Sequence, residues 1–122
     1  PGNGQQALAL GQTGYVLSIP GSWRTAAPDS GYQAAYQAAS GEKVNVAVQQ
    51  RSLEEIWDSA GDAREGFFGG YYWILFRDAG GRYACCTQLT ASACVTVAFS
   101  RSDPSLDATN SAILSSLSRS ME

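Results

Sequence analysis

Few side chains in this sequence belong to the types that carry out catalysis. The 122 residues include no histidine, so neither a Ser-His-Asp triad nor a Cys-His pair can be built. Glu54, Asp58 and Asp62 recur every four residues, and this spacing places three carboxylates on one face of a helix. Such carboxylates could hydrolyse a glycoside or bind a hard cation. A solvated helix face has the same spacing, so we expect no catalytic residue, no cofactor and no metal site.

Three cysteines, Cys85, Cys86 and Cys94, lie close together in the stretch RYACCTQLTASACV. Their spacing matches neither of the usual zinc patterns. If this stretch is a hairpin that turns near Thr90, Cys94 faces Cys86, or Cys85 if the turn is one residue shorter. We therefore expect a disulfide from Cys94 to Cys86, with Cys85 as the alternative partner; buried free thiols are the other reading. A disulfide favours an oxidising compartment, and we expect a periplasmic protein.

Composition and charge exclude several classes of protein. The net charge is −3 and the eight Lys and Arg residues are scattered, so no basic stripe is available to bind nucleic acid. No apolar run approaches the ~20 residues of a membrane-spanning helix. The Gly- and Gln-rich residues 1–13 predict a flexible leader, followed by a single domain over 14–122. Removal of a signal or lipid-anchor segment would leave such a start, and so would a cloned fragment.

The alternation of apolar and polar residues predicts six strands, at 15–19, 32–39, 43–50, 71–77, 82–88 and 93–100. Two helices are predicted from their start signals. Ser52 and Glu55 form a capping box before the first helix, whose inward stripe includes Trp57 and continues to a glycine pair. Asp103 caps the second helix and Pro104 opens it. We therefore predict an α+β fold, in which helices pack on the faces of an antiparallel sheet of about six strands.

The order of three segments, GYVLSIPGSW, NVAV and ILSSLSRS, resembles that of the PsbP-like α/β/α sandwich domains over residues 14–119. That family includes photosystem extrinsic subunits, a Ran-binding nuclear import factor, and bacterial envelope lipoproteins of the DcrB and LpqN kind. The resemblance implies that Trp23, in a Pro-x-x-Trp step after the first strand, packs at one end of the sheet. It also implies a function in docking, because known domains of this fold mostly act that way.

Three function classes are compatible with these observations. The one we expect is a non-enzymatic periplasmic protein-binding domain, in its most specific form an immunity protein that blocks the active site of a secreted cell-wall-degrading toxin. The first alternative is an envelope lipoprotein of DcrB or LpqN type with a housekeeping or lipid-related role. The second alternative is an enzyme that uses the acidic helix face. The expected partner is another protein, not a nucleic acid.

The stretch GFFGGYYW at 66–73 places five aromatic residues around a glycine pair. Not all of them can face inward, so we expect some to be exposed. Aromatic residues and arginine are the usual anchors of protein interfaces. We predict a partner-binding set at these tyrosines and the neighbouring hairpin tip, namely Tyr71, Tyr72, Arg77, Asp78 and Arg82. A short hairpin suits an inhibitor because it enters a cleft with little loss of conformational freedom. The alternative is that these hairpin ends only close the sheet.

Overall fold

The computed structural model describes residues 4–119 of the chain. In this part of the chain the elements are, in order, β1 (Gln5–Ala9), β2 (Tyr15–Pro20), β3 (Arg24–Ala26), β4 (Ala34–Gln37), β5 (Lys43–Gln49), α1 (Leu53–Ser59), β6 (Arg64–Phe68), β7 (Tyr71–Arg77), β8 (Tyr83–Gln88), β9 (Cys94–Phe99), α2 (Ala108–Ser115) and β10 (Ser118–Arg119). Neither described helix has the length and apolar character needed to cross a membrane.

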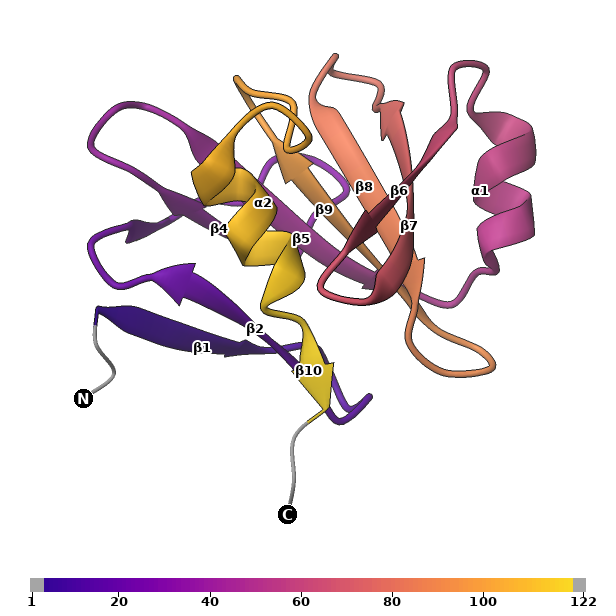
Figure 1. Cartoon of the computed structure of the whole chain (residues 1–122), viewed down its shortest axis with the longest axis horizontal. Coiled ribbons are helices and arrows are strands. Elements are labelled where there is room, and N and C mark those ends of the chain that lie inside the picture. The colour runs from indigo at the N-terminus through magenta and orange to yellow at the C-terminus, as the bar shows by residue number, and fades with distance from the viewer. Residues whose placement is uncertain (1–3, 120–122) are drawn as a thin grey trace.

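The strands form two sheets (Figure 1). The larger sheet has seven strands in the order β3-β4-β5-β9-β8-β7-β6, and the smaller has three in the order β1-β2-β10. Every neighbouring pair is antiparallel. The predicted α+β class is confirmed. The predicted count of about six strands in one sheet is approximate. β3 and β6 add two strands at the edges of the large sheet, and the predicted first strand, β2, belongs to the small sheet with β1 and β10.

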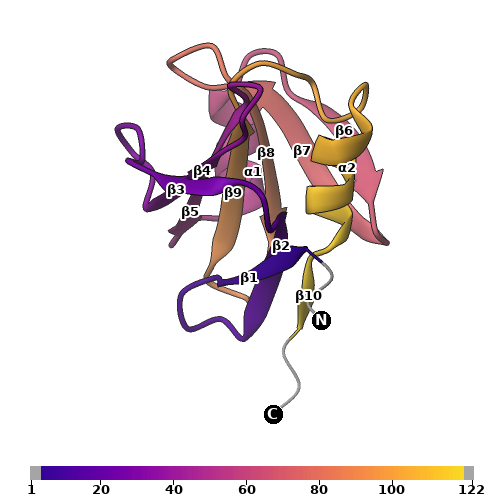
Figure 2. The ribbon, with the colours of Figure 1, turned by 90° about the vertical axis from the view of Figure 1, so that its left-hand side faces the viewer.

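The main hydrophobic core lies between the large sheet and a layer made of α2 and the small sheet (Figure 2). Every second residue of the central strands points into this core, as the sequence alternation predicts. From the other layer, α2 contributes Ile113 and Leu114, and β2 contributes Leu17 and Ile19. Trp23 is also buried in this core, with 8% of its surface exposed. The apolar face of α2 therefore packs against the large sheet, and the pairing of β10, the strand after α2, with β2 holds the end of the helix next to the small sheet.

The opposite face of the large sheet is covered by α1 and by the loop before β4, and its side chains include Cys86, Cys94 and the larger Phe76. Ile56 of α1 packs against Cys86 and Cys94. The side chain of Asn45, which is fully buried, accepts a hydrogen bond from the backbone N–H of Asp29 and donates one to the Asp29 carboxylate, both at 2.9 Å. These bonds hold the loop before β4 against the sheet.

The flexible leader predicted over residues 1–13 is wrong where β1 forms. β1 pairs with β2 along its whole length, from Gln5 opposite Pro20 to Ala9 opposite Val16. The side-chain amide of Gln6 donates to the carbonyl of Pro20 at 3.0 Å. The sequence does not indicate this strand, because the alternation within QQALA is short and glycines stand before and after it.

The first helix is shorter than predicted. It begins as expected, since Ser52 and Glu55 form the capping box, but it ends at Ser59. The residues after it form β6, which turns into β7 through Gly69-Gly70. These two glycines have φ values of 61° and 85°, the conformation that a tight type I′ hairpin turn requires. Trp57 consequently lies outside the predicted inward stripe and is 41% exposed.

The second helix also starts later than predicted. Its N-cap is Asp107, whose side chain accepts a hydrogen bond from the backbone N–H of Asn110 at 2.9 Å. Asp103, the predicted cap, accepts a hydrogen bond from the backbone N–H of Ser105 at 2.8 Å instead. It therefore closes a local turn, and the helix begins one turn further along the chain.

The predicted disulfide is not formed, and all three cysteines are buried free thiols. The β8–β9 register places Cys86 opposite Thr96 and Cys94 opposite Gln88, so the two cysteines are diagonal neighbours. The Cα atoms of diagonal partners in a sheet lie about 7–8 Å apart. A disulfide cannot bridge two residues at that separation without backbone movement. Cys85, the alternative partner, points to the main core on the other face. The expectation of an oxidising compartment therefore loses this support.

Candidate protein-binding site

The tip of the β7–β8 hairpin is held in one conformation by the carboxylate of Asp78. Its Oδ1 atom accepts hydrogen bonds from the backbone N–H groups of Gly80 at 3.0 Å and Arg82 at 2.8 Å. Its Oδ2 atom accepts from the hydroxyl of Tyr32 at 2.7 Å and from the guanidinium of Arg82 at 3.0 Å. Aspartate favours turns because it bonds the backbone two residues on, and Gly81 closes this turn with a φ of 81°. The tip is therefore a preformed, charged loop.

Arg82 also joins the hairpin to the loop before β4. Its guanidinium forms a second ion pair, at 3.2 Å, with Asp29, which in turn pairs with Lys43 at 3.3 Å. The carbon at the centre of this guanidinium lies 5.8 Å from the centre of the Tyr32 ring. Alternating positive and negative charges thus connect three segments that are far apart in the sequence.

The ionisable groups around the tip keep their charge states near neutral pH. Burial disfavours the ionised form of Asp78, but hydrogen bonds from Tyr32 and Arg82 outweigh it and lower the pKa of this carboxyl. The hydrogen bond from the Asn45 amide lowers the pKa of Asp29 against the effect of burial. Burial raises the pKa of Tyr32, and the bond to Asp78 raises it further. Asp29 and Asp78 therefore stay ionised and Tyr32 stays neutral, and the pKa values of all three move away from the range that suits proton transfer.

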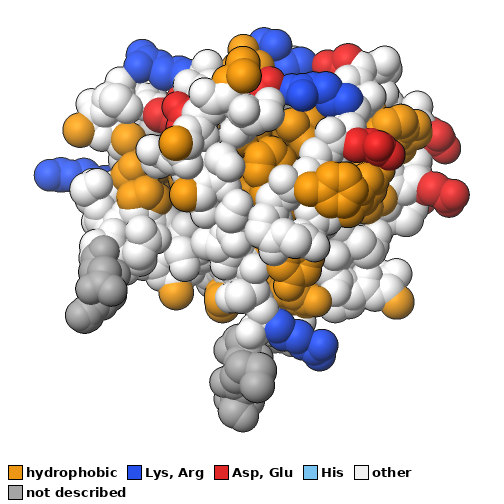
Figure 3. All heavy atoms as spheres, in the orientation of Figure 1, with side chains coloured by type: hydrophobic (Ala, Val, Ile, Leu, Met, Phe, Trp, Pro, Cys, Tyr) orange, Lys and Arg blue, Asp and Glu red, His pale blue; other side chains and the backbone are white. Residues whose placement is uncertain are grey.

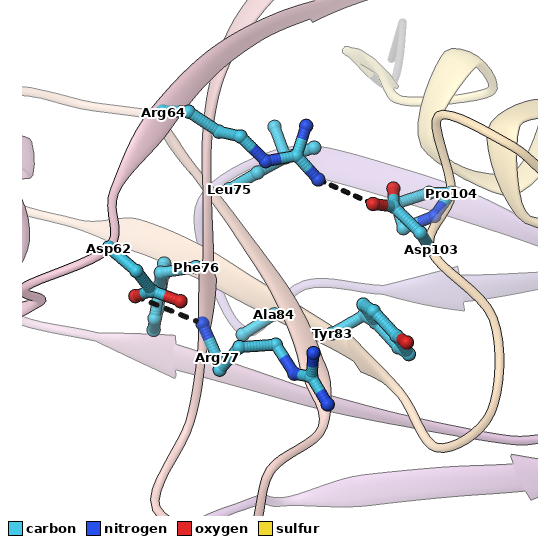
Figure 4. Close-up of a pocket in the computed structure, with 9 residues that line it drawn as sticks. All are labelled: Asp62, Arg64, Leu75, Phe76, Arg77, Tyr83, Ala84, Asp103 and Pro104. Carbon is cyan, nitrogen blue, oxygen red and sulfur yellow. Dashed lines mark hydrogen bonds and ion pairs between the residues drawn. The ribbon is translucent and has the colours of Figure 1, made fainter.

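A small cleft of about 140 Å³ opens beside the hairpin, towards β6 and the loop before α2 (Figure 4). Arg64 points across it and forms an ion pair with Asp103. The guanidinium of Arg77 lies 4.2 Å from the ring centre of Tyr83, and its backbone N–H donates to Asp62 at 3.4 Å. This first cleft presents two arginines and two aspartates, so its charges balance.

A second, larger cleft of about 380 Å³ lies between α1, the loop before β4 and the same hairpin. On its sheet side the hydroxyl of Thr96 donates to the side-chain carbonyl of Gln49 at 2.9 Å. The exposed Arg51 and the ring of Tyr32 also line it, and Arg77 is common to both clefts. The hairpin therefore stands next to two hollows of different size and polarity.

The structure brings together only part of the predicted contact set. Arg77, Asp78 and Arg82 lie together at the tip, but Asp78 and Arg82 direct their polar groups within the protein and position the loop. Tyr71 and Tyr72 lie at the other end of β7. Tyr71 packs against the main core, and the half-buried Tyr72 donates its hydroxyl proton to Glu65 at 3.1 Å.

The predicted acidic helix face is also divided. Glu54 and Asp58 are exposed on α1, but Asp62 lies beyond the end of this helix and lines the first cleft. Within residues 4–119, no group of three or more His, Cys, Asp or Glu side chains is placed to hold a metal ion. The three carboxylates therefore do not form one site.

Sequence reasoning missed the contribution of the loop before β4. The stretch APDSGY shows an ordinary turn signal, but nothing in it indicates that Asp29 and Tyr32 reach the hairpin tip. The Tyr32–Asp78 bond joins residues 46 positions apart. Only the strand order β5-β9-β8-β7, which is not readable from local patterns, brings these two segments together.

No family model and no curated protein sequence matches this chain, but solved structures match its fold. A crystal structure of a Bacteroides thetaiotaomicron protein superposes with a TM-score of 0.63 at 9% identity, over 93% of this chain and 48% of that one. The chain thus spans about half the length of that protein. The solution structure of PsbP (CyanoP) from the cyanobacterium Synechocystis superposes with a TM-score of 0.57 at 12% identity, over 96% of this chain and 93% of that one. The fold is therefore PsbP-like, and at these identities the likeness extends to the fold alone.

Proposed function

We propose that this chain is a non-enzymatic protein-binding domain and that the tip of its β7–β8 hairpin is the docking element. The observation that carries the proposal is the carboxylate of Asp78, whose four hydrogen bonds order the tip in the free protein. A loop that is already ordered loses little conformational freedom when it binds, so more of the contact free energy appears as affinity.

The surroundings of the tip fit a protein partner. Arg77 is exposed at the junction of the two clefts, with its guanidinium stacked on Tyr83. Arginine and tyrosine are enriched among the residues that dominate interface energetics. The fixed charges of both signs around the tip would select the orientation and the identity of the partner more than they add affinity.

Affinity capture from an extract of the native host tests this proposal. The wild-type domain and two charge-reversal variants, Arg77→Glu and Arg24→Glu, are used as baits, and retained proteins are identified by mass spectrometry. Arg24 is the matched control because it is an exposed arginine on β3, away from both clefts. We expect a protein retained by the wild type and by Arg24→Glu that is depleted from Arg77→Glu. Equal retention by all three baits, or no retained protein, contradicts the proposal.

The most specific form of the proposal is that the partner is a secreted cell-wall-degrading enzyme that this domain inhibits in the periplasm as an immunity protein. Support comes from the shape of the site, because a rigid two-stranded tip can enter an active-site cleft without first being ordered. The partner identified by capture is assayed for hydrolysis of purified peptidoglycan with the wild-type domain and with Arg77→Glu. Inhibition by the wild type alone is expected. A captured partner without hydrolytic activity overturns this form and leaves the docking proposal intact.

A further inference from the structure

The outer edge of β6 is an open strand edge. Among the strands of residues 4–119, β6 is the last of the large sheet and pairs only with β7. Their hairpin turns through Gly69-Gly70, so Phe68 and Tyr71 are the hydrogen-bonded pair that flanks the turn. Hydrogen-bonded and non-hydrogen-bonded pairs alternate along an antiparallel ladder. This alternation decides which backbone groups of β6 point to β7 and which point outward.

Two residues of β6 direct their backbone groups outward. Phe67–Tyr72 and Glu65–Ile74 are the non-hydrogen-bonded pairs of this ladder. The carbonyl of Tyr72 accepts the hydroxyl proton of Thr87 at 2.6 Å, on the side away from β6, which agrees with this assignment. The N–H and C=O groups of Glu65 and Phe67 have no hydrogen-bond partner among the residues that the structure describes.

The β6 edge also lacks the usual protection of an open edge. Natural edge strands are blunted by proline, lysine, bulges or a covering segment. β6 has no proline, lysine or bulge within REGFF. It contacts α2, but its Phe67 side chain is 70% exposed. The ring of Phe67 contacts the ring of Tyr72 edge-on at 5.4 Å between centres. An incoming strand would cover this aromatic pair.

The segment that forms α1 and β6 carries a strongly negative charge. Residues 53–67 hold five acidic residues and one arginine, a net charge of −4, against −3 for the whole chain. The arginine, Arg64, is already paired with Asp103. Figure 3 shows hydrophobic side chains gathered over β6 with acidic side chains beside them, on the side towards α1. An apolar strip with an acidic border favours a partner that combines apolar and basic residues.

We propose that the β6 edge is a strand-addition site for an extended, positively charged segment of a partner protein. Main-chain hydrogen bonds to Glu65 and Phe67 would give the affinity, and the side chains that alternate along the added strand would give the specificity. Apolar side chains of the segment cover Phe67 and Tyr72, and basic side chains lie next to Glu65. Pairing of β6 with a second copy of this chain would instead bring two segments of net charge −4 together, which opposes it. This site does not rest on the proposal for the hairpin tip.

Three fluorescent peptides of about eight residues test the proposal. One alternates Lys and Val, the second alternates Glu and Val, and the third carries proline at one central position of the Lys-Val sequence. Binding is measured by fluorescence anisotropy at low salt, and backbone protection by amide hydrogen exchange of the protein. We expect saturable binding of the Lys-Val peptide alone, with slowed exchange at Glu65 and Phe67. We expect the substitution Phe67→Ser to weaken binding of the Lys-Val peptide by about fivefold or more. Leu106→Ser is the matched control, because Leu106 is 87% exposed outside β6.

Each other outcome overturns the proposal. Equal binding of the Glu-Val peptide would show that the site does not select positive charge. Equal binding of the proline peptide would show that the peptide does not bind by adding a strand. Absence of binding up to about 1 mM peptide shows that the edge does not accept a strand. Slowed exchange of β6 that depends on protein concentration, without peptide, assigns the edge to a second copy of this chain.

Discussion

Tyr32 donates its hydroxyl proton to Asp78 at 2.7 Å, across 46 residues of sequence. This bond joins the loop before β4 to the tip of the β7–β8 hairpin, so the conformation of the tip depends on a segment that is not its neighbour in the chain. Asp29 and Arg82 form the second connection between the same two segments. The preformed tip is therefore a product of the tertiary structure and not of the turn alone.

Removal of the Tyr32 hydroxyl should destabilise the protein. A hydrogen bond to a charged group contributes about 1.5–3 kcal/mol, and Tyr32 is only partly buried, so we expect Tyr32→Phe to lower the free energy of unfolding by about 1–2 kcal/mol. Urea denaturation measures this change. Tyr36→Phe is the matched control, because Tyr36 packs against the core and its hydroxyl makes no hydrogen bond to another described residue. Equal effects of the two substitutions would show that the Tyr32–Asp78 bond does not stabilise the fold.

Acid should weaken the protein through the carboxylates at the tip. The pKa of Asp78 is lowered from an ordinary value of 3.8. A carboxyl whose pKa is lower in the folded state stabilises the fold fully above its unfolded pKa, and this contribution is lost as the pH falls from there through the folded pKa. We expect the free energy of unfolding to decrease below about pH 4, and less steeply in Asp78→Asn. Denaturation curves collected between neutral pH and strong acid check this, and identical pH profiles of the two proteins would contradict it.

Alkylation should find three free thiols. The interaction between the neighbouring Cys86 and Cys94 thiols raises the pKa of Cys86 and lowers that of Cys94, and burial raises the pKa of Cys85. Because all three are buried, we expect slow labelling of the native protein and three labels after denaturation without reductant. Intact-mass spectrometry counts the labels. A single label would show that two cysteines are bridged, and the diagonal register would then be wrong.

Ile56 should contribute more to stability than its larger neighbour Trp57. Ile56 is 3% exposed and packs between α1 and the sheet, whereas Trp57 is 41% exposed. Truncation of a buried isoleucine to alanine typically destabilises by about 2–5 kcal/mol, and we expect Trp57→Ala to have the smaller effect. Thermal and urea denaturation give the ranking. A larger loss of unfolding free energy for Trp57→Ala would show that Trp57 faces inward, as the sequence predicted.

Local patterns predicted the strands that bury one face, and they failed where two structures compete for the same residues. Val44 and Val46 face the core as their alternation indicates. Phe67 fits both a helical stripe and a strand, and the long-range pairing with Tyr72 in β7 decides for the strand. The turn residues of the hairpin tip predict its position. The sequence does not predict that Tyr32 holds the tip in place, because a contact between distant loops leaves no periodic signal.

The most direct test of docking by the hairpin tip is the affinity of the captured partner for three versions of the domain. Isothermal titration calorimetry compares the wild type with Arg77→Glu and with the control Arg24→Glu, after circular dichroism shows that all three are folded. We predict that Arg77→Glu weakens binding by about tenfold or more, the size of effect typical of an interface anchor. Arg24→Glu should change the affinity by less than about twofold. Equal affinities of the wild type and Arg77→Glu would contradict the assignment of the tip as the docking element.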